Sequence, residues 1–412
     1  MSLDQPYSAA ALKSTFRRID WDFAGAWTRY GLSPLHWYPV QLTPQVASSL
    51  ISALTRKNDI VCDPFCGSGT VLAEAMRLGR RAIGIDINPV ACLIARARTT
   101  LIPLRQLVAG NRGFLERLHF GTNVLRGTVL PLPLSRLQEE GYALTQALST
   151  PIPNPDLAQW FHPDVYRDLC LATQCVSVEA NPEIKTLLTV LISSVLRTSA
   201  GQSKSWRNIA DNVIPKRHVS KDIYGDCAQR LGGIERGMQI FIEQCAATGL
   251  DVCSANKLVT VESGDARQVD AVRPRSIDCV VTSPPSPNST DYLAAHRLSL
   301  LWLGHNLETL KEAEIGARRR RFSSQAIDTY LGDMRQSLLA IHRILKPGGR
   351  FAIVLRSAPP ETTLSDIPAV LAGFIVDDLR MKLIATFTRE ARSIHGRLRR
   401  GCELVLIYRK RS

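Results

Sequence analysis

A glycine-rich turn between an apolar strand and a helix is the feature of this sequence that most restricts its fold. Residues 59–62 predict a short strand, Gly67 and Gly69 lie in the turn that follows, and residues 71–78 have helical spacing of apolar side chains. Glycines at such a turn let the backbone bend sharply and approach a ligand closely. The turn therefore predicts an α/β protein with a ligand at the carboxyl end of its first strand.

A carboxylate at the end of the next strand strengthens this interpretation. Asp86 ends the strand predicted at 82–87, nineteen residues after Gly67, where it can accept hydrogen bonds from both hydroxyls of a ribose. A dinucleotide site is disfavoured, because Leu72 stands in place of a third glycine and Asp63 would repel a pyrophosphate. An acidic turn suits a ligand with an ammonium group, such as S-adenosylmethionine. The alternative is a structural turn in another kind of α/β enzyme.

Two consecutive prolines directly after a buried strand supply the candidate chemistry. The strand predicted at 277–282 leads into Ser283, Pro284 and Pro285, which hold the backbone extended and leave carbonyls without a helix or sheet partner. The exocyclic amine of a nucleobase is a poor nucleophile, because its lone pair is delocalised into the ring. A hydroxyl and the first proline carbonyl, both accepting from that amine, would favour a tetrahedral nitrogen able to attack a sulfonium methyl in line. The alternative is that the prolines merely end a strand.

Strands and helices alternate on both sides of a helical middle. After a helix at 89–98 the alternation stops, and further helices are predicted at 164–177, 183–197 and 224–247. The alternation resumes with strands at 259–261, 277–282, 350–355 and 403–409 and a helix at 327–345. We therefore expect a doubly wound, mostly parallel sheet with a helical insertion. The expected parts are an irregular N-terminal arm (1–35), the first half of the α/β domain (36–105), the insertion (106–255) and the second half (256–412).

The glycine turn, Asp86 and residues 282–292 resemble motifs I, II and IV of the amino-methyltransferases of DNA, which make N4-methylcytosine and N6-methyladenine. Residues 36–39, 264–266 and 296–304 are also similar to segments of that family. The resemblance covers both ends of the chain but not the helical middle. It implies a Rossmann-like class I methyltransferase fold and S-adenosyl-L-methionine as the cofactor.

The resemblance also implies roles for individual residues. The cofactor-binding residues would be Asp63, Phe65, Gly67, Gly69, Thr70, Asp86, Ile87, Asn88, Asp265 and Ala266. The catalytic residues would be Ser283, Pro284 and Pro285. The substrate-binding residues would be Ser286, Asp291, Tyr292, Arg318, Arg319, Arg320 and Arg321. No metal is expected.

Two positions of motif IV bear on the substrate. Ser283 resembles the cytosine-N4 type, whereas Asp or Asn is the more usual adenine-N6 signature, so the expected reaction is methylation of cytosine N4 in DNA. Adenine N6 or a base in RNA remains the second interpretation. Ser286 stands where the family has an aromatic ring that stacks on the flipped base, which predicts weaker base capture unless Tyr292 or another ring takes its place. A third interpretation is a catalytically impaired, nucleic-acid-binding relative.

The charge balance points to a polyanionic partner. Lys plus Arg number 51 against 37 Asp plus Glu, a formal net charge of +14. We expect double-stranded DNA with a flipped target base, gripped at its phosphates by the run Arg318 to Arg321 and recognised by the insertion. A restriction-modification system with a cognate restriction endonuclease is the expected setting.

The cysteines form no Cys-x-x-Cys pair, and no leader or membrane-spanning stretch is recognised, which predicts a cytoplasmic protein. The sequence leaves the oligomeric state open.

Overall fold

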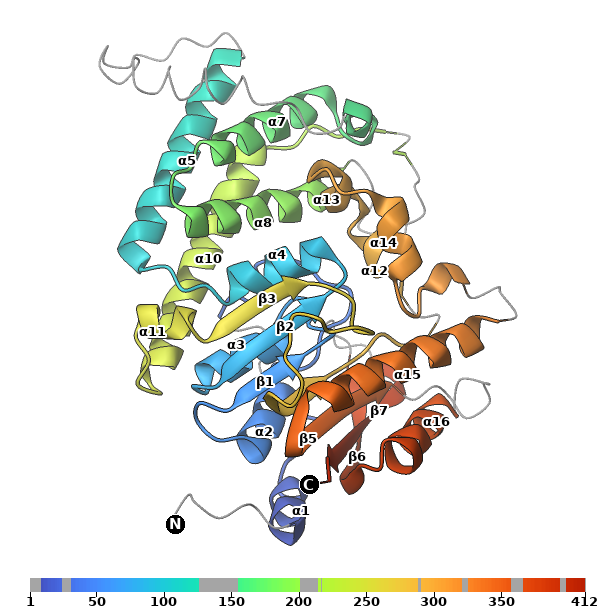
Figure 1. Cartoon of the computed structure of the whole chain (residues 1–412). Helices are drawn as coiled ribbons and strands as arrows, with labels where there is room; N and C mark the ends of the chain where they lie inside the picture. The colour runs from blue at the N-terminus through green and yellow to red at the C-terminus, as the bar shows by residue number, and fades with distance from the viewer. Residues whose placement is uncertain are drawn as a thin grey trace.

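A single seven-stranded sheet forms the centre of the protein (Figure 1). The computed structural model describes residues 9–23, 31–125, 155–200, 214–215, 217–287, 290–320, 325–356, 366–392 and 398–411. The strands are β1 (Ile60–Asp63), β2 (Arg81–Asp86), β3 (Val259–Ser263), β4 (Ile277–Thr282), β5 (Leu345–Arg356), β6 (Lys382–Arg392) and β7 (Leu398–Arg409). Their order is β3-β2-β1-β4-β5-β7-β6, with β1 to β5 parallel and β7 antiparallel to both of its neighbours. The expected doubly wound, mostly parallel, Rossmann-like sheet is confirmed.

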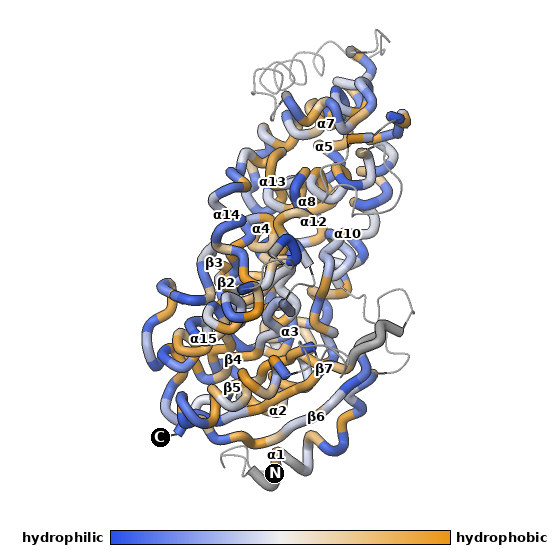
Figure 2. The backbone as a smooth tube through the Cα atoms, turned by 90° about the vertical axis from the view of Figure 1, so that its right-hand side faces the viewer, coloured by the Kyte–Doolittle hydropathy of each residue, from blue (hydrophilic) through white to orange (hydrophobic). Residues whose placement is uncertain are grey.

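Helices cover the sheet on both faces, as the near-continuous apolar character of β4 and of residues 351–355 in β5 requires (Figure 2). One face packs against α1 (Ala9–Arg17), α2 (Pro44–Leu54), α3 (Thr70–Arg77) and part of α4 (Pro89–Arg98). The other packs against α15 (Ala326–Ile344), α16 (Ile367–Gly373) and the turn η3 (Phe374–Asp378). Between β4 and α15 the chain forms α12 (Tyr292–Ala295), α13 (Arg297–Trp302), α14 (Leu307–Ala313) and η2 (Arg318–Arg320).

The helical insertion shares its core with the α/β domain. It contains α5 (Leu104–Leu125), η1 (Pro155–Trp160), α7 (Pro163–Ser177), α8 (Pro182–Ser199), α10 (Ile223–Ala246) and α11 (Val252–Asn256). One apolar cluster continues from α4 through α5, α7, α8 and α10 to α13. Figure 1 shows α8 and α10 lying against the α4 side of the sheet. Within the described part of the chain, none of the helices combines the length and the apolar character needed to cross a bilayer.

Among the elements that the sequence analysis did not predict are helix α5, strand β6 and helix α1. The long helix α5 was not predicted because glycines interrupt its apolar pattern; Gly110 lies where α8 approaches, and an added Cβ would come within 2.7 Å of Ile184. Strand β6 was also not predicted. The N-terminal arm, expected to be irregular, contains α1, whose Phe16 packs with Trp21 against Phe387 of β6. Trp27 and Tyr30 of the arm lie outside the described residues.

Candidate active site

A cavity opens at the carboxyl ends of β1, β2 and β4, with a volume of about 1160 Å³ that includes the open solvent at its mouth. Because these strands are neighbours in the sheet, the segments that follow them meet at one edge. The predicted residues that line this cavity are Asp63, Phe65, Gly67, Thr70, Asp86, Ile87, Asn88, Asp265, Ala266, Ser283, Pro284, Pro285, Ser286 and Tyr292. Gly69, Asp291, Arg318 and Arg319 are not among its lining residues.

The glycine turn is held tightly by its surroundings. Gly67 has φ +50° and Gly69 has φ +80°, in the left-handed region that side chains other than glycine rarely adopt. A Cβ at Gly67 would lie 3.2 Å from the ring of Tyr38, and one at Gly69 would lie 2.9 Å from the Cβ of Ala95 in α4. Gly67 therefore lets the turn pass beneath Tyr38 at the cavity wall, and Gly69 lets it pack against α4.

Asp86 organises the turn as well as facing the cavity. One of its carboxylate oxygens accepts the N–H of Gly67 at 2.8 Å, and the other accepts the N–H of Asn88 at 2.9 Å. Burial raises the pKa of Asp86 to about 6, and these two hydrogen bonds oppose the rise. A carboxylate has about four lone-pair positions, so two remain for a ligand.

A buried hydrogen bond joins the glycine turn to the proline motif. The Thr282 hydroxyl donates to Asp63 at 2.6 Å, and the N–H of Phe65 donates to the same oxygen at 3.1 Å. Burial raises the pKa of Asp63 to about 7, although both hydrogen bonds lower it. The spacing of residues in the sequence did not reveal this link, because Thr282 is 219 positions from Asp63.

The polar groups of the proline motif are oriented by neighbouring strands and helices. The Ser283 hydroxyl donates to the carbonyl of Val354 in β5 at 3.3 Å, which leaves its oxygen lone pairs as acceptors. The carbonyl of Pro285 accepts the Tyr330 hydroxyl of α15 at 3.0 Å. The motif thus has a serine oxygen that can accept a further hydrogen bond at the cavity wall.

Two further predicted cofactor residues, Asn88 and Asp265, have partners within the protein. The Asn88 side chain accepts the N–H of Val90 at 3.0 Å and donates to the His296 ring at 3.0 Å. The Asp265 carboxylate is bound by the guanidinium of Arg267, with a shortest distance of 2.6 Å. Any ligand contact from these two positions would therefore use the backbone or the remaining lone pairs.

Within the arginine run, Arg319 is held by contacts with other residues of the protein. The Arg319 guanidinium donates to Glu314 and to the carbonyl of Lys311, and the Arg319 N–H donates to Asp291 at 3.0 Å. Asp291 is thus tied to the run instead of facing the cavity. Arg321 lies outside the described residues, as do Lys204 to Asn208 of the insertion, and phosphate binding by the run stays a prediction.

The structure adds cavity residues that the sequence analysis did not single out for the site: Tyr38, Glu314, Arg356 and Glu403. With Asp63, Asp86 and Asp265, the two added glutamates make five carboxylates around one cavity. Asp265, Glu314 and Glu403 are paired with Arg267, Arg319 and Arg389, so Asp63 and Asp86 are the carboxylates that would favour a ligand with positive charge. No motif in the sequence marks Glu314 or Glu403. Each reaches the cavity from a segment that is far from the glycine turn in the sequence, so only the folded structure brings it there.

Comparison with known proteins finds a matching family model, relatives with similar sequences and similar solved structures. Residues 15–97 match the N6_N4_Mtase family model, described as DNA methylase. The Type II methyltransferase M.MvaI of Kocuria varians is 26% identical over 280 residues, covering 65% of this chain and 56% of that protein. The DNA adenine methyltransferase YhdJ of Escherichia coli is 40% identical over 68 residues, 16% of this chain and 22% of YhdJ. The chain thus spans little more than half the length of the Kocuria relative. Among solved structures, the rRNA methyltransferase aviRa of Streptomyces viridochromogenes has a TM-score of 0.35 at 12% identity, covering 96% of this chain and 95% of that one.

Proposed function

We propose that this protein belongs to the N6/N4 family of DNA methylases and that it transfers a methyl group from S-adenosylmethionine to an exocyclic amine of a DNA base, cytosine N4 in the first place. The observation that carries the proposal is the Asp63–Thr282 hydrogen bond. It joins the turn that would hold the cofactor to the Ser-Pro-Pro segment that would hold the amine, and both line one cavity.

The cavity fits S-adenosylmethionine by its charge and its donor set. Asp86 keeps two lone-pair positions for ribose hydroxyls, and the carboxyl group of Asp63 at the same cavity suits a ligand with an ammonium group. The buried Asp63 would ionise next to that ammonium group, because a nearby positive charge lowers the pKa of a carboxyl. The bound cofactor would supply an electrophilic methyl group.

The chain's own residues would orient and activate the amine. The Ser283 oxygen, whose hydrogen points to Val354, and the carbonyl of Pro284 would each accept one N–H of the target amine. When both amine hydrogens are hydrogen-bonded to these acceptors, a tetrahedral nitrogen is favoured, with its lone pair directed at the methyl group. Cytosine N4 is proposed ahead of adenine N6 on the serine at position 283, and the adenine enzyme among the relatives keeps adenine N6 as the second candidate.

The proposed partner is double-stranded DNA with its target base flipped into the cavity. Relatives named Type II methyltransferases support a role in a restriction-modification system, with a cognate endonuclease as a further proposed partner. The helical insertion is the proposed target-recognition region. The net charge of +14 supports binding to a polyanion.

The deciding experiment identifies the methylated nucleoside. DNA from a host without methyltransferases is incubated with the protein and isotopically labelled S-adenosylmethionine, digested, and analysed by mass spectrometry, with Ser283→Ala as the matched control. We expect labelled N4-methylcytosine that depends on Ser283. Labelled N6-methyladenine would support the second candidate. No label in DNA would contradict the proposal, and a parallel reaction with RNA would then separate an RNA base methyltransferase from an impaired relative.

A further inference from the structure

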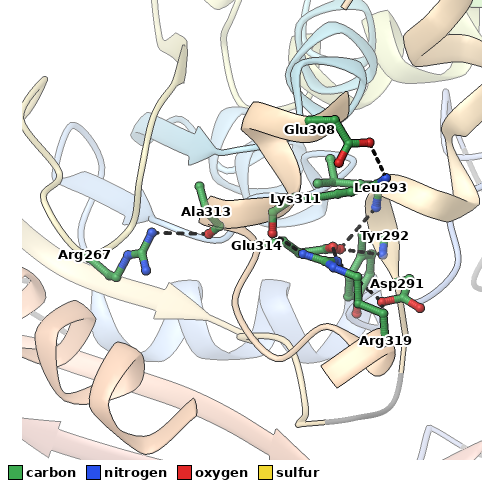
Figure 3. A network of polar contacts seen from close by, with 9 residues as sticks. All are labelled: Arg267, Asp291, Tyr292, Leu293, Glu308, Lys311, Ala313, Glu314 and Arg319. Carbon is green, nitrogen blue, oxygen red and sulfur yellow. Dashed lines mark hydrogen bonds and ion pairs between the residues drawn. The ribbon is translucent and has the colours of Figure 1, made fainter. Parts of the chain in front are cut away.

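The buried carboxylate of Glu314 holds the start of α12, directly after the proline motif. Glu314 is only 4% exposed, and its Oε1 accepts the N–H groups of Tyr292 at 2.8 Å and Leu293 at 3.2 Å. Its Oε2 pairs with the guanidinium of Arg319 (Figure 3). Glu314 thus satisfies two backbone donors of a helix that lies more than twenty positions earlier in the chain.

Asp291, the residue before α12, also contacts Arg319. The Asp291 carboxylate makes no capping hydrogen bond to α12 and instead accepts the backbone N–H of Arg319 at 3.0 Å. The same carboxylate oxygen lies 3.7 Å from the Arg319 guanidinium. Figure 3 shows Arg319 between Asp291 and Glu314. One arginine thus contacts both carboxylates, and its single positive charge stabilises the buried Glu314, whose charge would otherwise be costly.

The residue fixed by this arrangement presents an aromatic ring to the cavity. Tyr292 lines the cavity, and its ring centroid lies 5.8 Å from that of Tyr38 at an interplanar angle of 33°. Ser283 and Ser286 line the same cavity, and Ser286 offers no ring. A planar base entering beside Ser283 would need an aromatic surface from another position.

We infer that Glu314 is a positioning residue that, with Arg319, fixes the Tyr292 ring as the stacking surface for the target base. The inference rests on the proposed function. It assigns to Tyr292 the stacking role that an aromatic residue at position 286 has in the family. Glu314 acts through the backbone of α12, so its loss should weaken capture of the base and leave cofactor binding intact.

The test compares Tyr292→Ala, Glu314→Ala and the double variant in methyl transfer to unmethylated DNA. Stacking on one aromatic ring contributes about 1–3 kcal/mol per base, so loss of the ring should raise the KM for DNA roughly tenfold or more. We expect such an increase in both single variants and little further increase in the double variant, because the two residues act as one unit. Tyr292→Phe and Glu314→Gln, which keep the ring and one acceptor for the α12 amides, should show smaller increases.

Two further measurements separate positioning from loss of structure. Calorimetry should give an unchanged Kd for S-adenosylmethionine in Glu314→Ala, and hydrogen exchange at Tyr292 and Leu293 should be faster in Glu314→Ala than in Glu314→Gln. Glu308→Ala is the matched control, because it removes an exposed ion pair with Lys311 in nearby α14.

Several outcomes would overturn the inference. An unchanged KM in Tyr292→Ala removes the stacking role, and additive effects in the double variant separate Glu314 from Tyr292. A wild-type protein that transfers no methyl group to DNA contradicts the proposed function itself, and the inference falls with it.

Discussion

Asp86→Asn tests the cofactor site with the smallest change in shape. In the wild type, the two carboxylate oxygens accept one backbone N–H each, from Gly67 and Asn88, and the remaining lone pairs would take the two ribose hydroxyls. Asparagine keeps one of these oxygens and replaces the other with an NH2 group. The substitution therefore removes the charge, one ribose acceptor and one acceptor for the glycine turn.

The structure predicts different magnitudes for binding and for stability. A hydrogen bond to a charged group contributes about 1.5–3 kcal/mol, so the Kd for S-adenosylmethionine should rise about 10- to 100-fold. Burial raises the pKa of Asp86 from 3.8 to about 6, so the ionised carboxylate costs about 3 kcal/mol at neutral pH, a cost that asparagine removes. Leaving one buried N–H without an acceptor costs about 1–3 kcal/mol. These terms nearly cancel, and the Tm of the ligand-free protein should change little.

Calorimetric titration with S-adenosylmethionine and thermal unfolding without it would measure the two effects. Asp270→Asn, at an exposed position after the loop of Asp265, is the matched control and should alter neither. An unchanged Kd for Asp86→Asn would refute the ribose assignment. A large fall in Tm together with a raised Kd would mean that Asp86 acts mainly by holding the turn.

Three further predictions concern the same cavity. Gly67→Ala should raise the Kd for S-adenosylmethionine, since its Cβ would meet the Tyr38 ring at 3.2 Å from a residue at φ +50°; unchanged affinity in calorimetry would contradict this packing. Because burial raises the pKa of Asp63 to about 7, the ligand-free protein should lose stability as the pH rises from about 4 through about 7, while cofactor affinity should increase as Asp63 ionises. Asp63→Asn, which cannot ionise at this position, is the control, and a wild-type affinity that does not change with pH would contradict the ammonium assignment. Ser283→Ala should lower kcat about 10²–10³-fold with an unchanged cofactor Kd, measured by methyl transfer and calorimetry; an unchanged kcat would exclude Ser283 as an acceptor for the amine.

Local patterns in the sequence were sufficient for the elements that build the sheet edge. The predicted strand at 277–282 matches β4, the helix at 89–98 matches α4, and the glycine turn lies between β1 and α3 as expected. Turn chemistry and apolar spacing act over a few residues, so the sequence displays them directly. For the same reason, Asp86 and Ser283 could be assigned to the ends of strands and hence to one edge of the sheet.

Contacts between distant segments were decided only by the tertiary structure. The sequence gives no sign that Thr282 donates to Asp63, that Glu314 accepts from the first N–H groups of α12, or that Tyr38 covers Gly67. It also gives no sign that Arg319 of the arginine run is paired with Glu314. A local pattern records which backbone conformation a segment prefers. Which side chains meet in the cavity depends on the strand order and on helix packing across the whole chain, and these exist only once the sheet is assembled.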